Sequence, residues 1–297
     1  MEDRQARRPY YCICSRTALR YSPRRRIGDE VFMMKHVLSI AGTDPSGGAG
    51  AAADCKTICA HGCFALNVIT AVVSQNTQGV RGYMDVTPEL IASQMDAVFE
   101  DISVDAVKIG MVSNPDTIRI IAKKIKQYQP PIVVVDPVMV ATSGHRLLQP
   151  EAEQTLQDVL IPLADVLTPN IPEAEVLTGR TIRSCEEMEQ AAKSIAAMGA
   201  KAVLVKGGHR MTDATDVLYD GQRWYHFAGK RVQSTSTHGT GCTLSSAIAS
   251  NLAKGRPLEE AVRDAKEYVF QGICHAEPIG KGHGPLNHFY AWNSSEL

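Results

Sequence analysis

The chain has 297 residues, of which 44% are hydrophobic and 21% are charged, and its net charge is −1. This length suits one large domain or two small ones, and the composition is typical of a soluble globular enzyme. Residues 1–34 hold eight arginines against four acidic residues, a charge of +4, which leaves −5 for the mildly acidic remainder. That balance argues against nucleic acid as the main partner, and the longest apolar runs are too short to span a membrane.

The eight cysteines do not form the dense pattern of a disulfide scaffold in a chain of this length. Cys55, Cys59 and Cys63 are spaced by four in a predicted helix, so they lie along one face. A metal site and small buried hydrophobic side chains are the two interpretations. The second is favoured, because no histidine pair or CxxC completes a zinc pattern. Free cysteines favour a reducing compartment, and we expect a cytoplasmic protein.

The arginine-rich head, residues 1–34, has no apolar periodicity and no apolar stretch of a secretory signal. We expect it to lie outside the fold, either disordered or an artefact of an upstream start, with the true start at Met33 or Met34. A transit peptide is the alternative. The folded domain is expected to run over 35–297.

From Lys35 onward, strand-like and helix-like segments alternate. Short apolar runs predict strands at 36–42, 65–73, 106–110, 132–138, 165–170 and 202–208. Longer segments with Ser, Thr or Asn caps, N-terminal prolines or C-terminal glycines predict helices at 49–62, 87–101, 114–128, 184–198, 240–254 and 258–275. Asp220-Gly221 predicts a hairpin over 216–227.

Strands separated by crossovers of helix length form a parallel sheet that is covered on both faces. The predicted fold class is therefore α/β, a three-layer α/β/α arrangement with a mostly parallel central sheet and a small β-hairpin. In such sheets, ligands bind beyond the carboxyl ends of the strands. Polar residues directly after each strand are the candidates for a functional site.

The nucleotide-binding signature must be identified among several possibilities. A Walker A motif is absent, and "GAGAAA" at 48–53 fits the loose dinucleotide pattern GxGxxA. That pattern needs an acidic residue about twenty positions on, but no acid occurs there before Asp85. A Rossmann site is therefore disfavoured.

The segment "HGTGC", residues 238–242, stands where a helix begins. Glycines at Gly239 and Gly241 would expose backbone N–H groups, and the helix dipole favours an anion there. The anion would be a phosphate or the charge that builds on a transferred phosphoryl group. A glycine-rich turn without a ligand is the alternative.

Other candidates follow the remaining strands. Asp136 comes directly after a buried strand and needs a metal, a lysine or backbone donors as partner. Asn170 and Glu173 fit a capping box and, equally, a role near magnesium and phosphate. Lys206 could neutralise phosphate or be a solvated lysine. Together these groups are of the kinds that enzymes use to position and neutralise phosphates in phosphoryl transfer.

Several long motifs occur in order: "IAGTDPSGGAG", "SQNTQGV", "KIGM", "DPVM", "TPNIPEAEVL", "VKGGH", "THGTGCT" and "GHGPLNHFYAW". Through them the chain, from about Val37 to Trp292, resembles the hydroxymethylpyrimidine/phosphomethylpyrimidine kinases of thiamine biosynthesis. The resemblance implies a ribokinase-like fold, a homodimer, and ATP with Mg²⁺ as cofactors. It implies phosphorylation of hydroxymethylpyrimidine and then of its monophosphate, which gives the pyrophosphate.

The resemblance also assigns expected roles to matching positions. Substrate would contact Gln75, Asp54, Gly42, Met111 and Val138. ATP phosphates would contact Lys206, Asn170, Glu173 and Thr240, and Mg²⁺ would be held by Asp136 and Glu173. Gly239 and Gly241 would form the anion hole.

Cys242 stands where many ribokinase-like enzymes carry a catalytic aspartate, so the resemblance makes it the base. A thiol at a helix N-terminus is expected to have a lowered pKa. A pyridoxine or pyridoxal kinase, or a dual-activity enzyme, is the nearest alternative, and the retained Gln75 favours the thiamine role. A non-catalytic ligand sensor is the alternative from another class, and the retained Asp136 and Lys206 argue against it.

Overall fold

A computed structural model describes residues 33–139, 148–208 and 214–292. The expectations about the arginine-rich head fall on residues 1–32, outside the described residues, and stay predictions. No helix within these three ranges combines the length and the hydrophobicity needed to cross a membrane.

Within the described residues, the main sheet has eight strands in the order β10-β9-β8-β7-β6-β5-β1-β2. The six strands β8, β7, β6, β5, β1 and β2 pair in parallel. The strands β9 and β10 add an antiparallel hairpin at the β8 edge. The strands are β1 (His36–Ala41), β2 (Phe64–Ile69), β5 (Ala106–Ile109), β6 (Val133–Val135), β7 (Val166–Leu167), β8 (Ala202–Val205), β9 (Asp216–Tyr219) and β10 (Trp224–Phe227). The predicted α/β fold and the hairpin over 216–227 are confirmed.

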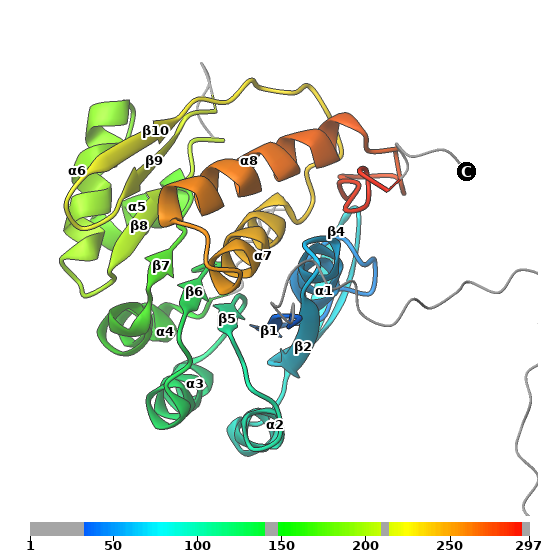
Figure 1. Cartoon of the computed structure of the whole chain (residues 1–297), viewed down its shortest axis with the longest axis vertical. Helices are drawn as coiled ribbons and strands as arrows, with labels where there is room; N and C mark the ends of the chain where they lie inside the picture. The colour runs from blue at the N-terminus through cyan, green and yellow to red at the C-terminus, as the bar shows by residue number, and fades with distance from the viewer. Residues whose placement is uncertain (1–32, 140–147, 209–213, 293–297) are drawn as a thin grey trace, which may run out of the picture. The chain divides into compact units, whose positions relative to one another are not determined.

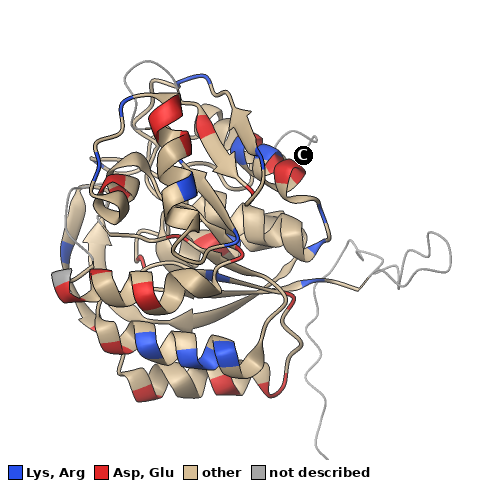
Figure 2. Ribbon diagram, turned by 90° about the vertical axis from the view of Figure 1, so that its left-hand side faces the viewer, with Lys and Arg blue, Asp and Glu red and all other residues tan. Residues whose placement is uncertain are grey.

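Helices cover both faces of this sheet, which makes three layers (Figure 1). One face packs against α1 (Gly50–Ala60), α7 (Thr240–Ala253) and α8 (Leu258–Cys274). The other face packs against the remaining helices: α2 (Pro88–Phe99), α3 (Pro115–Tyr128), α4 (Pro150–Thr155), α5 (Ile171–Thr178) and α6 (Cys185–Ala196). Acidic and basic residues are interspersed along the helices in the side view (Figure 2).

The two apolar cores follow from the alternation of side chains along each strand. In β1, Leu38 and Ile40 belong to the core with α2 and α3, whereas Val37 belongs to the core with α1 and α7. Because side chains alternate with period two, Ser39 and Lys108 also point toward the α1–α7 layer. Both are fully buried, so two polar side chains lie inside that layer.

The prediction of one strand over 65–73 is wrong. The chain leaves the main sheet at Thr70, and β3 (Ala71–Asn76) pairs instead with β4 (Gly79–Asp85) in a separate two-stranded antiparallel sheet. The amide of Gln94 bonds both the N–H and the C=O of Ile69, and the Thr70 hydroxyl donates to the carbonyl of Met111 at 2.7 Å. These long-range bonds set the break, which an unbroken apolar run cannot reveal.

One helical stretch was not predicted. Residues 150–163 form α4, a π-helical turn (Leu156–Leu160) and a 3₁₀ turn (Ile161–Leu163) in succession. Changes of helical type within fourteen residues blur the 3.6-residue periodicity, so the sequence pattern is weak here.

Candidate active site

A cavity of about 1470 Å³ opens at the carboxyl edge of the parallel strands. It collects nearly all the candidate residues from elements far apart in sequence. Its lining includes Gly42, Gln75, Met111, Asp136, Val138, Asn170, Glu173, Lys206, Gly239, Thr240, Gly241 and Cys242. Of the predicted site residues, only Asp54 is not on this wall.

The start of α7 forms one side of the cavity. Its N-cap, Gly239, has φ of 76° and packs so closely on the preceding loop that a Cβ would lie 1.8 Å from the carbonyl oxygen of Gly48. Only glycine fits such a left-handed position at this distance. Helix geometry leaves the first N–H groups of α7 without an intrahelical acceptor, and the residues from Gly239 to Cys242 line the cavity, so this helix start is a candidate anion site.

Asp136 and Lys206 form an ion pair facing this helix terminus. The Lys206 Nζ lies 2.7 Å from Oδ1 of Asp136, and the Thr168 hydroxyl donates to the same oxygen at 3.2 Å. A Cβ on Gly241 would lie 3.4 Å from both Asp136 Oδ2 and Lys206 Nζ. Burial opposes the charge of Lys206, but Asp136 and Glu173 raise its pKa. The site therefore holds a fixed cation beside exposed backbone donors.

Asn170 and Glu173 form the predicted capping box of α5. The Asn170 side chain accepts from the Glu173 N–H at 2.9 Å, and the Asn170 N–H donates to Oε2 of Glu173 at 2.8 Å. Both residues also line the cavity, so the cap does not exclude a second role. Burial, with a contribution from Asp136, raises the pKa of Glu173 to about 7, while Lys206 opposes that rise.

The other end of the cavity is largely apolar. Val73, Met111 and Val138 pack together there, and Gln75 lies on β3 two residues beyond Val73. A Cβ on Gly42 would lie 3.0 Å from the Met111 sulfur, so the backbone approaches this wall closely. A flat ring with one amide beside it fits such a wall.

Asp44, one of the polar residues that follow the first strand and are candidates by position, connects the two ends of the cavity in a way that the sequence did not indicate. Its carboxylate accepts from the N–H groups of Ser46 and Ala49, both at 2.8 Å, and contacts His238 Nε2 at 2.8 Å. Burial alone would raise its pKa, but hydrogen bonds from His238, Ser46 and Gln75 hold it well below its usual range. Asp44 thus links the loop after β1 to Gln75 and to the residue preceding Gly239.

The far rim of the cavity was also missed. It includes Arg263, Lys266 and Phe270 of α8 together with His226 and Phe227 of β10. The α8 residues recur at three- and four-residue spacing, which puts them on one helix face. That spacing was the available signal, but the sequence alone does not say what the face meets.

Asp54 and Cys242 lie in surroundings that the sequence did not indicate. Asp54 is fully buried and bonds Lys108, Ser39 and Ser246, so its side chain does not line the cavity, and its expected role toward substrate stays a prediction. Cys242 does not have a lowered thiol pKa in the protein alone. Burial raises the pKa of Cys242 to about 11, and nearby Lys108 and the Gly50 N–H offset this only in part.

Comparison with known proteins identifies the family. A family model described as phosphomethylpyrimidine kinase matches residues 44–287. A hydroxymethylpyrimidine/phosphomethylpyrimidine kinase from Rhizobium meliloti is 51% identical over 259 residues, covering 86% of this chain and 97% of that protein. The thiamine biosynthesis bifunctional protein ThiED from Geobacter sulfurreducens is 49% identical over 261 residues, 88% of this chain, which spans only 53% of that longer protein.

Solved structures agree with these relatives. Phosphomethylpyrimidine kinase from Clostridium difficile 630 has a TM-score of 0.73 and 46% identity, covering 80% of this chain and 99% of that one. Pyridoxal kinase from Staphylococcus aureus, in complex with AMP-PCP and pyridoxal, has a TM-score of 0.81 and 32% identity, covering 89% and 96%. The chain therefore belongs to the phosphomethylpyrimidine kinase family and has the ribokinase-like fold.

Proposed function

We propose that this protein transfers the γ-phosphoryl group of ATP to hydroxymethylpyrimidine, and then a second one to the monophosphate, for thiamine biosynthesis. The observation that carries the proposal is the single cavity that holds both Gln75 with its apolar wall and the Asp136–Lys206 pair at the start of α7. The family membership and the names of the relatives support the same reaction.

Substrate recognition would fall to the apolar end of the cavity. The side-chain amide of Gln75 offers a donor and an acceptor side by side, which match an amino group and a ring nitrogen of a pyrimidine. Met111 and Val138 would hold the faces of the ring, and the backbone at Gly42 would close one edge. The hydroxymethyl oxygen would then point toward α7.

Phosphoryl transfer would take place between Lys206 and the start of α7. The N–H groups of Gly239 and Gly241 would stabilise the charge of the moving phosphoryl group, and Lys206 would neutralise an ATP phosphate. In this step the substrate oxygen forms a bond to the γ-phosphorus, and the bond to the β–γ bridging oxygen breaks. Cys242 is the group proposed to take the hydroxyl proton, in its thiolate form.

The residues present fit a Mg²⁺ ion that shares its coordination with substrate phosphates better than they fit a metal ion bound by protein side chains alone. Asp136 and Glu173 offer carboxylate oxygens, which hard cations prefer, and no group of three metal-binding side chains occurs among the described residues. Mg²⁺ commonly binds through one or two carboxylates together with substrate phosphates and water. When bound, it would neutralise phosphate charge; Asp136 and Glu173 would hold it.

Turnover measurements test this function. ADP release should be faster with hydroxymethylpyrimidine than with pyridoxal, and Cys242→Ala should reduce kcat strongly while pyrimidine binding stays nearly unchanged. The alternative is a vitamin B6 kinase or a dual enzyme, favoured by the likeness to the Staphylococcus aureus pyridoxal kinase. A much higher kcat/KM for pyridoxal than for hydroxymethylpyrimidine would overturn the thiamine role. Unchanged turnover in Cys242→Ala would exclude Cys242 as the catalytic base.

A cytoplasmic homodimer belongs to the same proposal. The β3–β4 sheet exposes 58% of Val72 and 76% of Met84, which are directly paired across the two strands and could be covered by a second copy. Free thiols at Cys55, Cys59, Cys63, Cys242 and Cys274 fit a reducing compartment. Light scattering of the purified protein should give twice the chain mass, and a monomer at micromolar concentration would contradict the dimer.

A further inference from the structure

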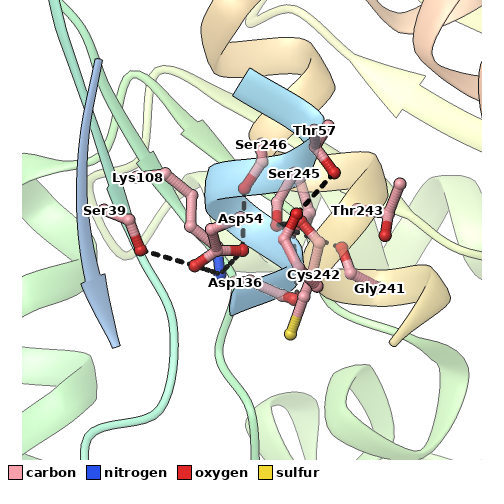
Figure 3. A network of polar contacts seen from close by, with 12 residues as sticks. Ser39, Asp54, Thr57, Lys108, Asp136, Gly241, Cys242, Thr243, Ser245 and Ser246 are labelled. Atoms are coloured by element: carbon pink, nitrogen blue, oxygen red, sulfur yellow. Dashed lines mark hydrogen bonds and ion pairs between the residues drawn. The ribbon is translucent and has the colours of Figure 1, made fainter. Parts of the chain in front are cut away.

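A buried ion pair lies in the layer between the sheet and α7 (Figure 3). Lys108 on β5 places its Nζ 2.9 Å from each carboxylate oxygen of Asp54 on α1, and both side chains are fully buried. The hydroxyls of Ser39 on β1 and Ser246 on α7 donate to the same carboxylate at 2.6 and 2.8 Å. One carboxylate therefore connects four separate elements.

The ammonium group of Lys108 lies directly behind the cavity wall. A Cβ on Gly110 would come within 2.7 Å of the Lys108 Nζ, so the ammonium is packed against the backbone there. Gly110 immediately precedes Met111, which lines the cavity. The pair thus lies close to the site even though Asp54 does not open into it.

Through Ser246, the same pair is connected to the helix that carries Cys242. Ser246, which bonds Asp54, follows Cys242 by four residues on α7, so the two lie above one another on the same helix face (Figure 3). The charged groups that act on the Cys242 thiol are Lys108, Asp54, Asp136 and Lys206, and the Gly50 N–H bonds the sulfur. Among them Lys108 has a larger effect on the thiol than Asp54 has.

Stability alone does not account for this pair. Taking two charges out of water costs about as much as their attraction returns, and apolar replacements of similar volume are often neutral or stabilising. The lysine nevertheless stays charged. Burial lowers its pKa, but Asp54, Cys242 and Asp136 raise it above its usual range.

We propose that Lys108, held by Asp54, is a positioning residue for phosphoryl transfer that places a fixed positive charge behind Cys242 and stabilises its thiolate. The inference rests on the proposed function, because it gives the thiolate its task as proton acceptor. Burial disfavours the Cys242 thiolate, and the fixed charge of Lys108 offsets part of that cost. Both side chains of the pair are fully buried, so water does not screen the charge of Lys108.

The principal test is the double variant Lys108→Met/Asp54→Asn, which removes both charges and keeps similar volumes. Alkylation of Cys242 by iodoacetamide, followed by mass spectrometry of its peptide, reports the thiolate as a function of pH without any substrate. We expect the alkylation profile to move to higher pH, with a loss of about tenfold in rate at pH 8, equivalent to one pKa unit. The kcat for hydroxymethylpyrimidine should fall by at least as much, whereas the KM for ATP should stay within about threefold.

A control pair with more exposed side chains is available on the opposite face of the sheet. Lys124 also bonds both carboxylate oxygens of an aspartate, Asp96, at 2.6 and 2.7 Å, between α2 and α3. The double variant Lys124→Met/Asp96→Asn should leave kcat and the Cys242 alkylation profile unchanged. An equal effect of the two double variants would show a general loss of structure and overturn the proposal.

A second variant decides the question if the first does not fold. Lys108→Gln alone removes the positive charge and keeps a hydrogen-bonding partner for Asp54, so the alkylation profile should move to higher pH. An unchanged or downward profile in this variant overturns the proposal, as does an unchanged profile in the double variant. A wild-type protein that shows no turnover on hydroxymethylpyrimidine would defeat the proposed function, while the substrate-free alkylation profiles still judge Lys108.

Discussion

Replacement of Gly239 by alanine tests the geometry of the anion site most directly. Gly239 caps α7 with φ of 76°, and a Cβ there would lie 1.8 Å from Gly48 O and 3.0 Å from the Cα of Ala49. Both contacts are with backbone, so no side chain can rotate away to make room. The loop after β1 and the start of α7 must separate.

The required displacement can be read from the structure. Real Cβ contacts are not found below 3.0 Å, so the two backbones must move apart by about 1.2 Å. A misplacement of about 1 Å at a reacting centre costs on the order of 10²-fold in rate. Gly239→Ala should therefore lower kcat/KM about a hundredfold or more. The left-handed backbone adds a strain of about 1–2 kcal/mol.

Gly62 provides the matched control for that strain. Its φ is 73°, but a Cβ there would have nothing within 4 Å. Gly62→Ala should therefore cost only about 1–2 kcal/mol of stability and leave activity unchanged. Thermal melting and ATP-dependent ADP release, measured on both variants, separate the strain from the collision. If Gly239→Ala keeps kcat/KM within about threefold of Gly62→Ala, the close approach does not control the anion site and the reasoning is refuted.

Two further predictions concern substrate recognition and acid stability. Gln75→Leu removes the paired donor and acceptor and should raise the KM for hydroxymethylpyrimidine ten- to a hundredfold, with the KM for ATP little changed. An unchanged KM for hydroxymethylpyrimidine in steady-state assays would exclude Gln75 as the residue that recognises the pyrimidine. Burial, aided by Lys56, lowers the pKa of His288 to about 4 from 6.5, and burial lowers that of His61 likewise. Between pH 6.5 and 4 these two histidines therefore bind protons in the unfolded chain but stay neutral in the folded chain. Stability is lost as the pH falls through this window. Between pH 7 and pH 5, urea unfolding of His288→Gln should lose about 2 kcal/mol less than wild type, and equal losses would contradict the assignment.

Most of the fold could be predicted because its signals are local. Thr87 and Asn114 cap α2 and α3 with their side chains, each followed by a proline, as the sequence indicates. The run of valines in β6 is buried on both faces, as expected for a central parallel strand. The wrong prediction of one strand across Thr70 has a different origin. The hydrogen bonds with Gln94 and Met111 that end β2 involve residues from distant segments.

For the candidate site, too, the positions of several residues could be predicted from local signals. The glycines and polar residues after the strands could be placed at one edge from the topology, because parallel strands bring their carboxyl ends together. The capping box of Asn170 and Glu173 also followed from residue spacing, and the structure contains it. The catalytic roles assigned to these residues stay predictions.

The sequence by itself determined most of the order of strands and helices, the caps and the composition of the anion loop, because these depend on neighbours a few residues apart. Only the tertiary structure decided which charges meet. It paired Asp54 with Lys108 and Asp136 with Lys206, and it joined Asp44 to His238 across the two loops. It also reversed the expected shift in the Cys242 pKa, because burial outweighs the helix terminus and the neighbouring cation. Desolvation and long-range charge depend on three-dimensional surroundings, which the residue spacing does not contain.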